Sequence, residues 1–224
     1  MAAPSIRARV RSEMNREIKE VARRRLAADG ANLSLRAVAR DMGMVASALY
    51  RYFPSRDALL TALIVDAYGD LRDAARTAAA AIPDDRPRAR WLAVGHAVRA
   101  WALAHPAEYG LVYGTPVPGY SAPPETTAPA AEVILLLAEI AAAHATPPAD
   151  PVPAAYRSDL EQLIDAQPGG IAPELLDRVL LAWTQLFGAV SFELFGRLDG
   201  MVAARAEYFD RHLRLIADLV GLPR

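Results

Sequence analysis

The sequence predicts an all-α protein, because Ala and Leu dominate it and apolar residues recur at spacings of three and four. Alternating runs of β-branched residues, which would indicate strands, are missing. With 224 residues, 53% of them apolar, and a mean hydropathy of +0.11, the chain can bury a substantial core. We therefore expect a globular helical protein of one or two domains.

The first 55 residues should form three helices. Apolar residues at helical spacing predict the first helix over 10–26, and Gly30 follows it as a stop signal. Ser34 offers a capping hydroxyl to a short second helix. Gly43 interrupts the pattern, and a third helix then runs up to Pro54, which ends it.

The rest of the chain should add helices separated by breaks rich in Pro and Gly. Ser55 caps a long fourth helix that runs to about residue 81. The later elements are expected as a helix over 91–105, a short helix over 106–113, a loop over 114–129, an apolar helix over 130–143, a Pro-rich break over 146–153, and long helices over 175–195 and 202–220. The predicted domains are residues 1–55 and 56–224.

The composition narrows the kinds of site that the chain can form. The absence of cysteine excludes disulfides and thiolate metal sites and is compatible with a cytosolic location. The four histidines are isolated, and neither metal-ligand spacing, a G-x-S-x-G motif nor a phosphate loop occurs. We therefore expect no metal, no cofactor and no enzymatic activity. No membrane association is expected either, because the N-terminus lacks the apolar region of a signal peptide and no uninterrupted apolar run reaches about 18 residues.

The charges are distributed unevenly along the chain. Residues 1–60 carry 12 Arg and Lys against 6 Asp and Glu, whereas residues 61–224 carry 13 against 20. A local excess of positive charge is what binding to nucleic-acid phosphates requires. Chance clustering on solvated helix faces would give the same numbers. The sequence motifs are therefore needed to decide between a nucleic-acid site and chance.

Residues 34–53 have the pattern of a helix-turn-helix. Ala39 is small enough for two helices to cross closely, and Gly43 can adopt the left-handed conformation of the tight turn. Val38, Leu49 and Phe53 lie on the inward stripe that would hold the second helix in place. The spacing and the residue types agree with a DNA-binding helix-turn-helix.

Residues 45–59 closely resemble the recognition helix and following turn of the TetR family of bacterial regulators; their sequence is VASALYRYFPSRDAL. The resemblance covers about residues 10–65 and implies a subunit of about nine helices, with a three-helix DNA-binding domain on a ligand-binding helical body. The segments 91–95, 101–106 and 114–120 look like the C-terminal subgroup called the WHG domain.

The resemblance also implies roles for particular residues. It places Val45, Ala46, Ser47 and Arg51 at base edges, and Tyr50, Tyr52 and Arg56 at phosphates. Each role is chemically reasonable: an arginine can bond guanine with two N–H groups, short apolar side chains can touch thymine methyls, and the start of a helix offers N–H donors to phosphate. Ser34, at the start of the second helix, is expected to be a phosphate contact for the last of these reasons.

Other basic residues leave two readings open. Arg36 and Arg40 on the second helix are either DNA contacts or solvated charges. The N-terminal segment with Arg7, Arg9 and Arg11 is either a flexible arm that reaches an adjacent groove or an unstructured solvated arm.

In the C-terminal part, ring-bearing side chains on helices either pack in the core or line the pocket of a small apolar effector. Such a pocket would use an isolated polar group as its handle. The candidates are Trp91, His96, Trp101, Tyr109, Tyr113, Trp183 and Phe187.

The last two long helices are apolar on two faces, which predicts a homodimer built as an intermolecular four-helix bundle. The candidate interface residues are Leu175, Val179, Leu186, Phe209, Leu213, Ile216 and Val220. The expected partners are thus a palindromic DNA operator, a second copy of the chain and an apolar effector that releases a repressor from DNA. A helical scaffold whose helix-turn-helix only packs, and a helical enzyme using His96 or His105, are the alternatives.

Overall fold

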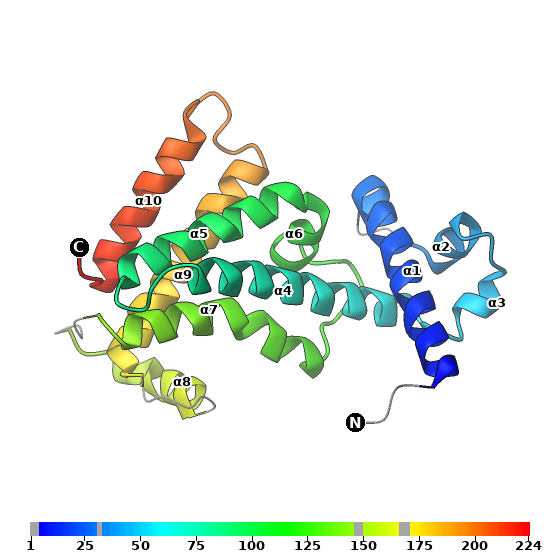
Figure 1. The fold of residues 1–224 in the computed structure, drawn as a ribbon, viewed down its shortest axis with the longest axis horizontal. Coiled ribbons are helices and arrows are strands. Elements are labelled where there is room, and N and C mark those ends of the chain that lie inside the picture. The colour runs from blue at the N-terminus through cyan, green and yellow to red at the C-terminus, as the bar shows by residue number, and fades with distance from the viewer. Residues whose placement is uncertain (1–4, 31–32, 146–149, 166–170) are drawn as a thin grey trace. The chain divides into compact units, whose positions relative to one another are not determined.

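The computed structural model describes residues 5–30, 33–145, 150–165 and 171–224. These residues contain ten α-helices and a 3₁₀ turn, η2, and no strand, which confirms the all-α prediction (Figure 1). The elements are α1 (Ile6–Asp29), α2 (Leu35–Asp41), α3 (Ala46–Leu49), α4 (Arg56–Ala80), α5 (Pro87–Ala104), α6 (Pro106–Tyr113), η2 (Pro124–Thr126), α7 (Thr127–Ala142), α8 (Ala154–Asp165), α9 (Pro173–Leu194) and α10 (Arg205–Val220).

The chain forms two compact units that are not consecutive in sequence. Unit 1 consists of Met1–Tyr68 and His105–Pro129, and unit 2 of Gly69–Ala104 and Ala130–Arg224. The sequence predicted a single boundary after residue 55. The structure instead divides α4 between the units and returns α6 and the following loop to unit 1.

The core of unit 1 is made by the first four helices together with the returning segment. Ile18, Val38, Leu49 and Leu59, from α1 to α4 in turn, are fully buried in one cluster. The returning segment adds Val117 to the same cluster, and α6 packs on α1. The hydroxyl of Tyr120 lies 2.9 Å from Oγ1 of buried Thr61 on α4, so the loop is tied to the helical core by a hydrogen bond as well.

Ion pairs hold α1 to its neighbours in unit 1. Lys19 Nζ and Arg23 Nη2 donate to the carboxylate of Asp66 on α4 at 2.8 and 2.9 Å. Arg25 Nη2 donates to Asp41 at the end of α2 at 2.7 Å. The pairing with Arg25 is the main reason why the pKa of Asp41 is below its usual value.

In unit 2, α5 and α9 both pack against α10 (Figure 1). Gly95 on α5 permits the closest approach, because a Cβ there would lie 2.6 Å from a methyl group of Leu213 on α10. Arg99 on α5 donates two hydrogen bonds of 2.6 Å to Glu193 on α9, and its guanidinium lies 5.4 Å from the centroid of the Phe209 ring. The buried carboxylate of Glu193 is therefore fully paired.

Three elements differ from the sequence prediction. The segment with Arg7, Arg9 and Arg11 is not an extended arm, because α1 already begins at Ile6, with the Ser5 hydroxyl accepting the N–H of Ala8. The helix α7 begins three residues earlier than expected, and α8 was not predicted at all. Of the predicted break over 146–153, residues 146–149 lie outside the described part of the chain.

The helix α9 is long and apolar enough to cross a membrane by length and composition. It is the one such helix in the described residues, and core helices of globular proteins pass the same test. Leu176, Val179, Ala182 and Val190 are buried within unit 2, as expected of a core helix.

Candidate nucleic-acid interface

The turn between α2 and α3 has the geometry that the sequence predicted. Gly43 has a φ of +67°, the left-handed conformation that glycine adopts without steric cost. Its N–H donates to the carbonyl of Arg40 at 3.1 Å, and the N–H of Met44 donates to the carbonyl of Ala39 at 2.9 Å. These two bonds form a Schellman motif, which closes α2 and redirects the chain into α3.

The helix α3 is anchored by one side and exposed on the other. Leu49 is fully buried in the core of unit 1, whereas Val45 is 70% exposed and Ser47 and Arg51 are exposed as well. Backbone hydrogen bonds continue the helical turn up to Phe53, whose N–H donates to the carbonyl of Leu49 at 3.1 Å. The short helix and the residues that flank it therefore present Val45, Ser47 and Arg51 outward, as a major-groove reader requires.

The predicted phosphate contacts Ser34 and Arg56 are brought together by the structure. Arg56, in the first turn of α4, donates its Nε to the carbonyl of Leu33 at 3.2 Å, and Ser34 is the next residue after Leu33. The starts of α2 and α4 thus lie side by side in unit 1. The guanidinium of Arg56 therefore lies beside the start of α2, which is the arrangement that the predicted phosphate contact requires.

Three of the predicted details need correction or refinement. Ser34 occupies the cap position of α2, but its side chain makes no capping hydrogen bond, which leaves the hydroxyl exposed. Ala46 and Tyr52 are partly buried against the core of unit 1, so they present less surface outward than Tyr50, which is 44% exposed. Arg56 also lies 3.7 Å from the carboxylate of Asp57.

A contact that was not predicted from the sequence joins α1 to the end of α3. Arg11 Nη2 donates to the carbonyl of Arg51 at 3.5 Å, and its guanidinium lies 5.9 Å from the centroid of the Tyr52 ring. The start of α1 therefore belongs to the same surface as the recognition helix. Helical spacing from Arg7 to Arg11 is the signal in the sequence that indicates a helix here and not an arm.

The candidate effector residues are divided between the units. Tyr109 and Tyr113 belong to unit 1, with ring centroids 5.2 Å apart, and burial raises the pKa of Tyr113 above its usual value. The other five belong to unit 2, where Trp183 and Phe187 have centroids 5.5 Å apart and Trp91 and Trp101 are buried.

His96 does not fit the role of a pocket handle. It lies on the exposed side of α5, with Nε2 3.1 Å from a carboxylate oxygen of Asp210.

The seven predicted interface residues are buried within unit 2 of the single chain. Each is at most 4% exposed within the single chain, although Ile216 also contributes to the lining of a hollow on the outer surface. The residues predicted from the sequence are therefore those of the inward of two apolar stripes. The members of that stripe are Leu175, Val179, Leu186, Phe209, Leu213, Ile216 and Val220.

The outward stripe of α9 and α10 is an exposed apolar face with two hollows of about 300 Å³ each. Gln185 and His212 line both hollows, so the two adjoin. Burial lowers the pKa of His212, which favours its neutral form. We call this surface the α9/α10 face; its apolar members are Leu181, Phe192, Tyr208, Leu215 and Leu219.

Comparison with known proteins agrees with this geometry. The sequence pattern of bacterial regulatory proteins of the tetR family matches residues 18–63, and that of tetracyclin repressor-like C-terminal domains matches residues 91–216. HTH-type transcriptional regulators of Mycobacterium tuberculosis and Mycobacterium bovis are 39% identical over 225 residues, covering 94% of this chain and 94% of each relative.

Solved structures show the same fold. The crystal structure of the regulatory protein SCO4313 has a TM-score of 0.79 and 37% identity, with 96% of this chain and 100% of that chain covered. A protein of unknown function from Rhodococcus sp. RHA1 has a TM-score of 0.65 and 24% identity, covering 94% and 95% of the two chains. The mycobacterial relatives and SCO4313 are named as regulators, which agrees with the sequence prediction that the chain is a regulator and not an enzyme. The chain belongs to the TetR family of helix-turn-helix transcriptional regulators.

Proposed function

We propose that this regulator is a repressor that binds a palindromic operator as a homodimer and leaves it when a small apolar effector binds. The observation that carries the DNA-binding part is the exposed side of α3, where Val45, Ser47 and Arg51 project from a helix fixed by buried Leu49. Because α3 is already folded in the free chain, its backbone has little conformational entropy left to lose when these side chains meet base edges.

The homodimer is supported by the α9/α10 face. Phe192, Leu215 and Leu219 are between 40% and 55% exposed there, and isolated globular chains rarely leave such a stripe open to water. A second copy related by a two-fold axis presents the same apolar stripe, so each copy covers the other. Two antiparallel helices from each copy would form a four-helix bundle.

A two-fold dimer carries two copies of α3. Their half-sites are then related by the same axis, which makes an approximately palindromic operator the matching DNA. An effector can weaken binding only by favouring a conformation in which the two α3 helices no longer fit their half-sites together. We place this activity on bacterial chromosomal DNA in the cytoplasm, as the role of a transcriptional regulator implies.

Selection of binding sequences from a random duplex pool tests the DNA part. The wild-type chain should enrich an inverted repeat, and its affinity for that repeat should fall steeply with salt, at a slope set by about 6 to 10 neutralised phosphates. Enrichment of direct or single half-sites would contradict the palindrome. A salt-independent affinity would contradict binding through this surface.

The effector is tested by a thermal-shift screen of apolar metabolites. A true effector should raise the Tm by mass action and should also lower the affinity for the selected repeat, because coupling between two sites is reciprocal. Substitution of Trp183 or Phe187, which pack ring to ring on α9, should weaken its binding if the aromatic residues of unit 2 form the pocket. A binder that leaves DNA affinity unchanged would not be the effector.

A further inference from the structure

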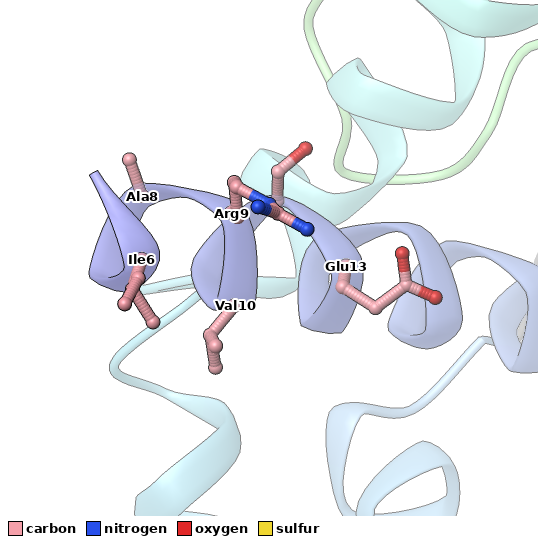
Figure 2. A pocket seen from close by; sticks show the side chains of 6 residues that line it. Ile6, Ala8, Arg9, Val10 and Glu13 are labelled. Atoms are coloured by element: carbon pink, nitrogen blue, oxygen red, sulfur yellow. The ribbon is translucent and has the colours of Figure 1, made fainter. Parts of the chain in front are cut away.

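The first two turns of α1 project beyond the core of unit 1. Every residue from Ile6 to Glu13 is exposed, and Ile18 is the first fully buried position of the helix. The surface beside these turns forms an open hollow of about 710 Å³ lined by Ile6, Ala8, Arg9, Val10, Ser12 and Glu13. Figure 2 shows the side chains of Ile6 and Val10 on the same side of the helix, and the Arg9 side chain in front of the helix, extending toward Glu13.

These turns are fixed next to the recognition helix by Arg11. Its hydrogen bond to the carbonyl of Arg51 and its position against the Tyr52 ring join α1 to the end of α3. Arg7 lies four residues before Arg11, so it projects from the same side of α1, about 6 Å further along the axis. Arg7 therefore extends the exposed cationic surface that begins at Arg51.

The positive charges at the start of α1 do not stabilise the helix itself. The first turn contains no acidic residue, and cations near a helix N-terminus are unfavourable to the helix. Within the described part of the chain, Arg7 and Arg9 form no ion pair, whereas Arg16, also on α1, is paired with Glu13. The first two turns thus offer exposed positive charge beside a DNA-reading helix.

We propose that these turns form a second DNA-contact surface, in which Arg7 binds backbone phosphates adjoining the groove entered by α3. The inference rests on the proposed DNA binding and adds a partner contact to it. The occupant is duplex DNA because its charge complements the arginines and because α3 brings it to this place. The contact is independent of base sequence and widens the footprint of each half of the dimer.

The charge test compares Arg7→Ala with Arg24→Ala. Both remove one exposed arginine from α1, but position 24 lies about 25 Å further along the helix. Fluorescence anisotropy with a random-sequence duplex of about 30 base pairs, roughly three helical turns, should be measured over a range of salt concentrations. Arg7→Ala should lower the slope of log affinity against log salt by about 0.9 for each phosphate that the variant no longer neutralises, and Arg24→Ala should leave it unchanged.

A second readout separates contact from a structural role. The chain contains no cysteine, so Arg7→Cys and Arg24→Cys each provide a single site for a photo-crosslinker. The label at position 7 should crosslink to the duplex, and the label at position 24 should not. Equal slopes or equal crosslinking for the two positions would overturn this inference while leaving the proposed function intact. A wild-type chain that binds no duplex DNA would overturn both.

Discussion

The exposed surface around α3 in unit 1 and the α9/α10 face of unit 2 are both open in the single chain, but they are built from opposite materials. The first is made of helix ends, hydroxyls and arginines held by a buried leucine, and the second is made of leucine and aromatic side chains around two shallow hollows. The difference indicates two kinds of partner: a polyanion for the first and an apolar surface of the same kind for the second.

The largest effect is expected when the apolar face is given a charge. Leu215→Asp would place a carboxylate in the centre of the proposed dimer interface, where it has no partner, at a cost of about 3 kcal/mol or more. Sedimentation should show a dimer constant weakened by about 100-fold or more. Leu103→Asp, at an exposed leucine on α5 outside the two hollows, is the control and should leave the dimer intact. A dimeric Leu215→Asp variant would show that the α9/α10 face has another partner.

Smaller effects on DNA binding should distinguish the residues that contact bases from those that contact phosphates. Arg51→Ala should lose about 1–3 kcal/mol at one base position of the selected repeat and relax the preference there. Arg56→Ala should weaken binding to all sequences alike, because Arg56 lies at the helix starts that we expect to bind phosphate. Competition binding against single-base variants of the repeat measures the difference. Identical profiles for the two variants would refute these separate roles.

The turn between α2 and α3 should respond to the loss of glycine. Gly43→Ala forces a side chain into the left-handed region at a cost of about 1–2 kcal/mol, although no atom blocks the Cβ. Thermal unfolding should therefore show a lower Tm, with DNA affinity reduced as α3 loses its fixed position. Gly110→Ala is the control, since that glycine is helical, lacks a positive φ and has open space around it. A Tm unchanged in Gly43→Ala would mean that the turn relaxes.

The smallest effect concerns pH and the pair between Arg25 and Asp41. The pKa of Asp41 is lowered in the folded protein, chiefly by the hydrogen bond from Arg25. Its contribution to stability is therefore present above the unfolded pKa of about 3.9 and is lost as the pH falls through the folded value. Asp41→Asn should lower the Tm slightly at neutral pH, and the gap to wild type should close in acid. A gap that persists in acid would assign the effect to packing.

The helix-turn-helix could be predicted from the sequence because its determinants are local. Gly43, the small Ala39 and the buried Leu49 are set within a few residues by turn geometry and helix periodicity. The stripe proposed as the dimer face could not be assigned from the sequence, because α10 has two apolar stripes and periodicity does not say which one turns inward. Leu213 and Leu215 look alike in sequence, but only Leu213 meets Gly95 on α5.

Other features depended on contacts between distant residues. In the sequence, the loop around Val117 and Tyr120 has the composition of an ordinary Pro-rich connection. Its hydrogen bond to Thr61 is seen only in the structure. The helix α8 was not predicted from the sequence, because its few apolar residues, among them buried Leu160, lie between segments rich in Pro and Gly. The sequence predicted the positive charge at the start of α1, but it did not predict that this segment is helical.

The return of residues 105–129 to unit 1 bears on how this regulator can be rebuilt. A fragment cut after residue 68 would leave the surface under Val117 and Tyr120 open to water and would lose the hydrogen bond to Thr61. A chimeric regulator that joins this DNA-binding unit to the ligand-binding domain of another protein would have to include residues 105–129 as well. The exchangeable module is therefore a discontinuous one.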